Sequence, residues 1–232
     1  MGSLPLLTGR PSAGVGLCGS AARGDFVDGW SDVDFIAWNL PDGSKTAEAL
    51  TSLVTQTAQR HGLHASLHLA DETGGNARRL GPLYDMKMRA VMRRVGIDVP
   101  VIAGTGPTAM ADAPTATDLG AQIHLLHDFA TTRLQAPAGS DTERKDAARR
   151  VLSVLSSAAR QTVSTREPDM SLRLPTVADA LQQHWPACNA TALLRDYDTF
   201  RRTGARNLDT AERLARQAHA AIRCIDKCTT RG

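Results

Sequence analysis

The chain has 232 residues, enough for one large domain or two small domains that share a cleft. Its composition of 42% hydrophobic and 22% charged residues is that of an ordinary soluble globular protein. The formal net charge of +3 lacks the large excess typical of nucleic-acid-binding proteins, so we do not expect a nucleic-acid partner. Mild basicity of this kind fits a small anionic ligand such as a nucleotide.

Neither membrane insertion nor secretion is expected. No stretch approaches the roughly 18 consecutive apolar residues that span a bilayer. The first residues lack the basic segment and long apolar segment of a secretory signal, so we expect a cytoplasmic protein with free thiols. Cys224 and Cys228 lie four residues apart on an expected helix. No further metal ligand is evident near them, so we interpret them, with Cys18 and Cys188, as structural or incidental thiols.

The first part of the chain alternates between strand and helix patterns. Short apolar runs predict buried strands at Val15–Cys18 and Val33–Trp38. Apolar residues at i, i+3 and i+4 spacing predict a helix over Lys45–His61, closed by a glycine. Strict alternation over Leu63–Ala70 then predicts a half-buried strand with Leu63, Ala65, Leu67 and Leu69 on one face.

The middle of the chain predicts the end of the first domain. A polar loop is expected over Asp71–Gly81, then a basic helix over Leu83–Val95 and a short edge strand over Val99–Ala103. Gly104–Thr117 is rich in small residues and contains two prolines, which is typical of a hinge between domains.

Beyond this segment the strand patterns stop. Helical periodicity continues in five stretches, at 118–134, 142–164, 176–184, 190–203 and 209–228. The sequence therefore predicts an α+β fold, with a small mixed-sheet domain over residues 1–104 followed by a C-terminal helical bundle over 118–232.

One segment, LCGSAARGDFVDGWSDVDF from Leu17 to Phe35, contains residues suited to binding phosphate. Gly19 and Ser20 follow a strand directly and lead into a short helix. Glycine has no Cβ, so its backbone can approach a ligand closely, and the N–H groups at a helix start can bind phosphate together with the Ser20 hydroxyl. Arg23 lies one turn later and can reach the same anion or an acidic neighbour.

The same segment ends in two acidic residues on a strand. Asp32 and Asp34 are two positions apart, so both side chains project from one face, about 6.6 Å apart along the backbone, while Val33 and Phe35 point into the core. Two carboxylates in this arrangement can share a divalent cation, and Mg²⁺ prefers such oxygen ligands. In phosphoryl or nucleotidyl transfer, the cation activates the attacking hydroxyl and neutralises charge on the triphosphate.

Gly-Ser, a spacer and Asp-x-Asp on a strand together resemble the signature of the polymerase-β nucleotidyltransferase superfamily. The form here, GSAARGD followed by WSDVDF, is similar to that of small bacterial members, which include minimal nucleotidyltransferases and the aminoglycoside or lincosamide nucleotidyltransferases. The resemblance is specific over Leu17–Phe35 and extends loosely to about Ala103. Beyond that residue, the helical part is similar only in kind to the C-terminal bundles of the antibiotic-modifying members.

The resemblance implies transfer of a nucleoside monophosphate, with ATP as the expected donor among NTPs, to a hydroxyl, with release of pyrophosphate. It implies that Asp32 and Asp34 are catalytic and hold Mg²⁺, and that Gly19, Ser20 and Arg23 bind the nucleotide. The helical domain is then expected to bind a small-molecule acceptor, such as an antibiotic, in the interdomain cleft.

This chain departs from the superfamily pattern at one position. Active members carry a third carboxylate on a later strand, facing the first two, where it acts as general base or as a further metal ligand. The expected strand Leu63–Ala70 instead shows His64, Ser66 and His68 on the face opposite its leucines. Three alternatives are open: His68 takes the proton from the acceptor hydroxyl, Asp71 or an acid of the helical domain does so, or the third group is absent.

Three functions are compatible with these observations. The first is nucleotidyl transfer to a small-molecule hydroxyl, which the predicted helical second domain favours. The second is an antitoxin-like minimal nucleotidyltransferase that modifies or binds a protein partner, although such proteins tend to end near Gly104. The third is a degenerate nucleotide-binding module, which the missing third acid favours. The expected basic helix carries Lys87, Arg89, Arg93 and Arg94, which either offer charge to a triphosphate or to RNA or form a solvated face.

Overall fold

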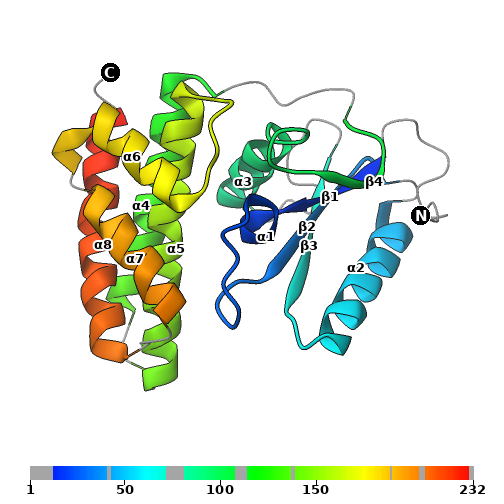
Figure 1. The fold of residues 1–232 in the computed structure, drawn as a ribbon, viewed down its shortest axis with the longest axis horizontal. Helices are drawn as coiled ribbons and strands as arrows, with labels where there is room; N and C mark the ends of the chain where they lie inside the picture. The colour runs from blue at the N-terminus through cyan, green and yellow to red at the C-terminus, as the bar shows by residue number, and fades with distance from the viewer. Residues whose placement is uncertain are drawn as a thin grey trace. The chain divides into compact units, whose positions relative to one another are not determined.

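The computed structural model describes residues 13–40, 43–71, 81–107, 114–136, 139–188, 190–203 and 207–229. The chain divides into two compact units, 1–113 and 114–232, and each is considered by itself. The first is α+β and the second is helical, as expected for the fold class (Figure 1). The division falls within the small-residue segment 104–117. The middle of that segment, and most of the expected loop 71–81, lie outside the described residues.

The first unit is built on a four-stranded mixed sheet with the order β3-β2-β1-β4. Its strands are β1 (Gly14–Cys18), β2 (Val33–Trp38), β3 (Ala65–Ala70) and β4 (Val101–Gly104). β1 pairs antiparallel with both β2 and β4, whereas β2 and β3 are parallel. A parallel pair needs a crossover connection, which contains α2 (Gly43–Arg60). The mixed sheet and its short edge strand β4 are therefore as predicted.

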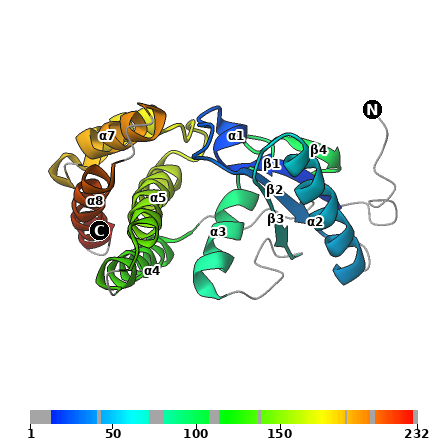
Figure 2. The same ribbon diagram turned by 90° about the horizontal axis from the view of Figure 1, so that it is seen from below.

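Helices cover both faces of this sheet, as Figures 1 and 2 show. On one face, Leu50 of α2 packs in a cluster with Val15, Ala37 and Leu67. This is the leucine face of β3, which the alternation in the sequence predicted.

The other sheet face packs against α3 (Pro82–Met92). Met88 and Met92 of this helix join a buried cluster that includes Cys18, Ile36 and Trp38. Residues of β2 that point towards α3 therefore alternate with residues that point towards α2. Asp34 is two and four residues from Ile36 and Trp38, so it lies on the same face as they do, towards α3.

β3 begins two residues later than the alternation predicts, and the first of these residues, Leu63, closes the preceding helix. Gly62 has a φ of +68°, a left-handed conformation that favours glycine. The N–H of Leu63 donates to the carbonyl of Ala58 (2.9 Å) and that of Gly62 to the carbonyl of Gln59 (3.1 Å). These bonds satisfy carbonyls at the end of α2, so Leu63 belongs to a helix cap rather than to the strand.

The second unit contains five α-helices among its described residues: α4 (Ala116–Gln135), α5 (Asp141–Arg166), α6 (Leu174–His184), α7 (Ala190–Thr203) and α8 (Leu208–Thr229), with a short 3₁₀ turn, η2 (Pro186–Cys188), before α7. α4, α5 and α8 pack together, and α6 pairs with α7. Capping boxes begin α4 at Thr115 and α5 at Ser140. The apolar face expected for the last helix is buried, at Leu214, Ala218, Ala221 and Ile225. Within the described residues, no helix has the length and apolarity needed to cross a membrane.

Substitution of Gly14 tests the packing at the edge of the sheet. A Cβ on Gly14 would lie 2.4 Å from both the Thr105 carbonyl oxygen and Cζ2 of Trp38, a fully buried side chain. We expect Gly14→Ala to lower the free energy of unfolding by about 2–3 kcal/mol, because overpacking forces the tryptophan and the β4 end apart. Urea denaturation measures the change. Gly106→Ala is the matched control, since a Cβ there meets nothing within 4 Å, and equal midpoints for the two variants would contradict the prediction.

Candidate functional site

Four side chains from three strands line up on the α3 face of the sheet. Asp34 of β2 lies opposite Cys18 of β1 and opposite Ser66 of β3 in the strand register. Directly opposed residues project from the same face, so Cys18, Asp34 and Ser66 form a row. His68 lies two residues beyond Ser66 and shares this face. We call Asp34, Ser66 and His68, together with Gly19, which directly follows Cys18, the carboxylate site.

Hydrogen bonds fix one oxygen of Asp34. The Ser66 hydroxyl donates to Oδ1 of Asp34 at 2.6 Å. Nε2 of His68 lies 3.2 Å from the Ser66 hydroxyl and 3.5 Å from the same Oδ1. Because the single hydroxyl proton of Ser66 goes to Asp34, the Ser66 oxygen accepts from His68 Nε2–H. When His68 is neutral, Nδ1 is therefore its acceptor nitrogen, a tautomer assigned from this network.

The surroundings keep Asp34 ionised. Burial by itself raises the pKa of its carboxyl group, but hydrogen bonds from His68 and Ser66, together with the charges of His68 and Lys87, outweigh burial and hold the pKa below its ordinary value. The Asp34 side chain is 29% exposed, so part of it is open to solvent or a ligand.

The second oxygen of Asp34 faces the backbone of Gly19. A Cβ on Gly19 would lie 2.4 Å from Oδ2 of Asp34, and Gly19 has a φ of +69°. Both facts exclude a side chain at this position. Gly19 begins α1 (Gly19–Arg23), and Ser20 follows as a half-buried residue. The structure thus brings the Gly-Ser turn and Asp34 into direct contact.

Asp32 lies just before β2 and is exposed. Among the described residues, its carboxylate makes no hydrogen bond or ion pair. The ligand atoms of Asp32, Asp34 and His68 do not come within 4.8 Å of one another as a group. The reason is local: Asp34 Oδ1 is turned towards β3 by Ser66, whereas Asp32 belongs to the loop that enters the strand. The spacing of two residues places Asp32 and Asp34 on one side of the strand, and of the two only Asp34 belongs to β2.

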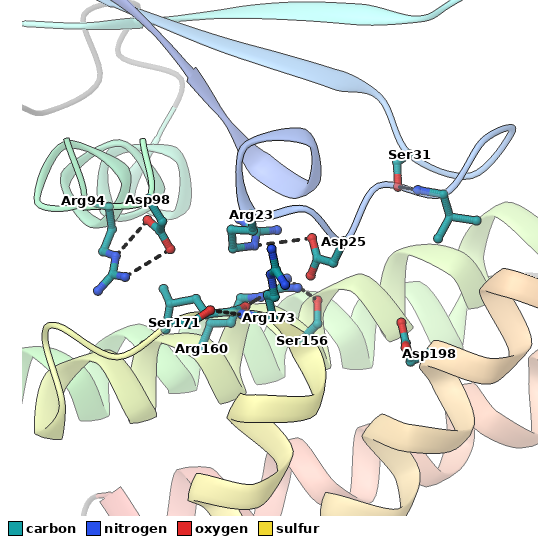
Figure 3. A network of polar contacts seen from close by, with 12 residues as sticks. Arg23, Asp25, Ser31, Arg94, Asp98, Ser156, Arg160, Ser171, Arg173 and Asp198 are labelled. Atoms are coloured by element: carbon teal, nitrogen blue, oxygen red, sulfur yellow. Dashed lines mark hydrogen bonds and ion pairs between the residues drawn. The ribbon is translucent and has the colours of Figure 1, made fainter. Parts of the chain in front are cut away.

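Arg23 is bound to an acidic neighbour. Its Nε lies 3.6 Å from Oδ1 of Asp25, a side chain only 2% exposed, as Figure 3 shows. The N–H of Asp25 donates to the carbonyl of Ser20 at 3.0 Å and closes the short helix. The sequence allowed Arg23 to reach either a bound anion or an acidic neighbour, and the structure shows the pairing with the acidic neighbour Asp25. Sequence reasoning did not single out Asp25, although an acid directly after the helix-ending Gly24 was a signal for it.

Two further side chains define the electrostatics of the site. Burial raises the pKa of the Cys18 thiol far above its ordinary value, and the adjacent Asp34 carboxylate raises it further, so Cys18 is a neutral core residue. Lys87 of α3 is exposed, with its ammonium 5.8 Å from the centre of the Tyr84 ring. Its charge acts on both Cys18 and Asp34. Lys87 is therefore a solvated residue whose positive charge also acts on the carboxylate site.

The basic helix does not offer all of its charges in this way. Arg94 is 5% exposed and donates to both oxygens of Asp98, at 2.9 and 3.0 Å (Figure 3). Such a bidentate pair closes the turn after α3 and is structural. Arg89 pairs with Asp85 at 2.9 Å.

β3 supplies no carboxylate to the face that carries Asp34. Asp71 follows the end of β3, five residues beyond Ser66, which corresponds to about 16 Å along the strand. Asp71 is also two and four residues from Leu69 and Leu67, so the alternation of a strand places it on the leucine face rather than on the face of Asp34. This geometry disfavours Asp71 as the third group, and it leaves His68 as the titratable side chain of β3 beside Asp34.

Comparisons with protein-family models and with curated proteins found no match to this chain. The interpretation of the site therefore depends on its own residues and geometry.

The Ser66 hydroxyl is expected to control the ionisation of Asp34. In Ser66→Ala the shortest hydrogen bond to the carboxylate is lost while burial remains, so the pKa of Asp34 should rise. Carbon-detected NMR titration of the Asp34 carboxyl measures the change. Ser66→Thr keeps a hydroxyl and should leave the pKa close to that of the wild type. An unchanged pKa in Ser66→Ala would show that the hydrogen bond does not hold the carboxylate.

The same pKa shift predicts a pH dependence of stability. A carboxyl group whose pKa is lower in the folded state contributes stability above its unfolded pKa of about 3.9, and this contribution is lost as the pH falls through the folded pKa. The difference in unfolding free energy between wild type and Ser66→Ala should therefore be constant near neutral pH and shrink in acid. Urea denaturation across this range tests the sign, and a difference that grows in acid would contradict it.

Proposed function

We propose that this protein is a Mg²⁺-dependent nucleotidyltransferase of the polymerase-β type, which transfers a nucleoside monophosphate from ATP or another NTP to the hydroxyl of a small molecule. The observation that supports this most is the contact between the Gly19 backbone and Oδ2 of an ionised Asp34. A close-approach glycine at the start of a helix and a carboxylate that can bind a cation belong together where a triphosphate–metal complex binds.

The residues present suit Mg²⁺. Asp34 is ionised, its Oδ1 is engaged by Ser66, and its Oδ2 accepts no hydrogen bond from the part of the chain that the structure describes. Asp32 is exposed two residues earlier and adds a second carboxylate. We propose that Asp32 and Asp34 hold the cation, which when bound supplies charge neutralisation on the triphosphate and activation of the acceptor hydroxyl.

Nearby residues have separate roles in this proposal. The Ser20 hydroxyl and the backbone N–H groups at the start of α1 bind phosphate oxygens, and Lys87 adds positive charge on the α3 side. Arg23 acts indirectly, because its pairing with Asp25 holds α1 and the Gly-Ser turn in place.

His68 is the proposed general base. Its Nε2 is held by the Ser66–Asp34 pair, which leaves Nδ1 to accept the proton of the acceptor hydroxyl. The oxygen then attacks the α-phosphorus, and pyrophosphate leaves. The imidazolium that forms is stabilised by Asp34, whose Oδ1 lies 3.5 Å from Nε2. The absence of a carboxylate on this face of β3 favours one other candidate function, a degenerate module that binds NTP without turnover.

A single incubation distinguishes the candidate functions. The purified chain is mixed with Mg²⁺, labelled NTPs and a panel of aminoglycosides and lincosamides, and pyrophosphate is followed. Label in a small product supports the proposed function, whereas label on protein supports the antitoxin-like alternative. Tight NTP binding without pyrophosphate release supports the degenerate module.

The aspartates provide the sharpest substitution test. Asp34→Asn and Asp32→Asn each remove a metal-binding charge, and we expect pyrophosphate release to fall by at least about 1,000-fold with the fold intact. Asp28→Asn is the matched control. Asp28 is exposed in the same loop and accepts from the N–H of Gly29 through Oδ1, a contact that asparagine keeps. Full activity in Asp34→Asn would refute the metal assignment.

Substitution of His68 tests the general base. His68→Gln keeps a hydrogen-bond donor to Ser66 but cannot take a proton, so kcat should fall by about 10²–10⁴-fold. The acid limb of the pH–kcat profile should disappear in the variant. A profile that keeps this limb would assign the base to another residue.

A further inference from the structure

The helical unit brings together three thiols that are distant in the sequence. Cys188 ends η2, whereas Cys224 and Cys228 belong to α8. Sγ of Cys224 lies 2.8 Å from Sγ of Cys188, and the sulfurs of Cys188 and Cys228 are 3.5 Å apart. All three sulfurs lie within 4.8 Å of one another. The sequence showed only the spacing of the pair on α8, and it is the fold that brings Cys188 to them.

Local structure explains how the cluster forms. Residues four apart on a helix lie one above the other on the same face, so Cys224 and Cys228 form a vertical pair near the end of α8. Burial of Ala221, Ile222 and Ile225 holds this helix against its neighbours. η2 packs against both α6 and α8, and the N–H of Cys188 donates to the carbonyl of Trp185 at 3.0 Å. Cys188 is 4% exposed, whereas the α8 pair is half-buried and accessible.

We propose that Cys188, Cys224 and Cys228 form a binding site for a soft divalent cation of the Zn²⁺ type. Thiolates select such ions, whereas Mg²⁺ prefers oxygen ligands, so this site is chemically distinct from the carboxylate site. A Zn–S bond of about 2.3 Å in tetrahedral geometry separates the sulfurs by about 3.8 Å. The separations of 2.8 and 3.5 Å therefore need to open by about 1 Å or less.

A metal ion accounts for the cluster better than a disulfide does. A disulfide has an S–S bond of about 2.05 Å and uses two of the three sulfurs. It also requires an oxidant, and it gives no reason for a third sulfur to lie 3.5 Å from Cys188. A cation uses all three sulfurs as the thiols release their protons. Within the described residues, three protein ligands come together, and a tetrahedral ion has a fourth position for a further ligand.

The position of the cluster defines what the ion does. It links η2, the short connection between α6 and α7, to the last turns of α8. Binding therefore fixes two segments separated by 36 residues or more, as a structural clip at the end of the bundle. This inference is independent of the proposed nucleotidyl transfer.

Metal titration of the full chain tests the site directly. The reduced, metal-free protein is titrated with Co²⁺ or Cd²⁺, and thiolate-to-metal charge-transfer absorption is followed. Zn²⁺ is then used in competition. We expect one ion per chain, displacement by Zn²⁺, and a rise of about 5–10 °C in the unfolding midpoint with Zn²⁺.

Cysteine variants make the test specific. Cys188→Ser and Cys228→Ser should each weaken binding by about 100-fold or more, whereas Cys18→Ser, which alters the remaining cysteine, should not. If Cys188→Ser does not fold, Cys228→Ser at the half-buried position and the wild-type titration still decide the matter. Absence of the absorption band, or its persistence in Cys228→Ser, would overturn the proposal. So would a Cys188–Cys224 disulfide found by peptide mapping in protein prepared without oxidant.

Discussion

The candidate site depends on the hydrogen bonds to the Asp34 carboxylate, because they offset the free-energy cost of burying its charge. Asp34 is placed in the sheet by β2, where its neighbours Ile36 and Trp38 are fully buried. Without donors, such a position favours the neutral acid. Ser66 and His68 reverse this preference from the adjacent parallel strand, and Gly19 leaves room for Oδ2 on the other side. The carboxylate is therefore charged, oriented and accessible at once, which a metal ligand requires.

The fold supplies these neighbours through its pairing rather than through sequence proximity. The antiparallel pairing of β1 with β2 places Gly19, the first residue after β1, next to Asp34, and the parallel pairing of β2 with β3 places Ser66 on the other side. α3 then brings Lys87 to the same face. Arg23 and Arg94 illustrate the opposite outcome, because each is bound to an aspartate that follows it closely and stabilises a turn. Basic residues close in sequence thus have different roles according to the acids beside them.

In the helical unit, the amphipathic helices bury faces of alanine, leucine and isoleucine, and capping boxes stabilise the starts of α4 and α5. The thiol cluster is the exception, because it joins a 3₁₀ turn to the end of α8 and contributes little apolar surface. The packing of the bundle does not itself require three thiols at one point, and this supports the proposal that the cluster binds a metal ion.

The sequence by itself determined the α+β class, the strands at 33–38 and near 15–18, the helix order, and the faces of β2 and β3, because these follow from periodicity and local caps. It also placed Gly19, Asp34 and His68 as candidates, since strand parity fixes which side chains share a face. Only the tertiary structure decided that Asp34 is held by Ser66, that Arg23 is engaged by Asp25, that Asp71 lies far along its strand from Asp34, and that Cys188 joins Cys224 and Cys228. These contacts depend on strand register and helix packing, which arise from interactions between distant segments and leave no periodic trace in the chain.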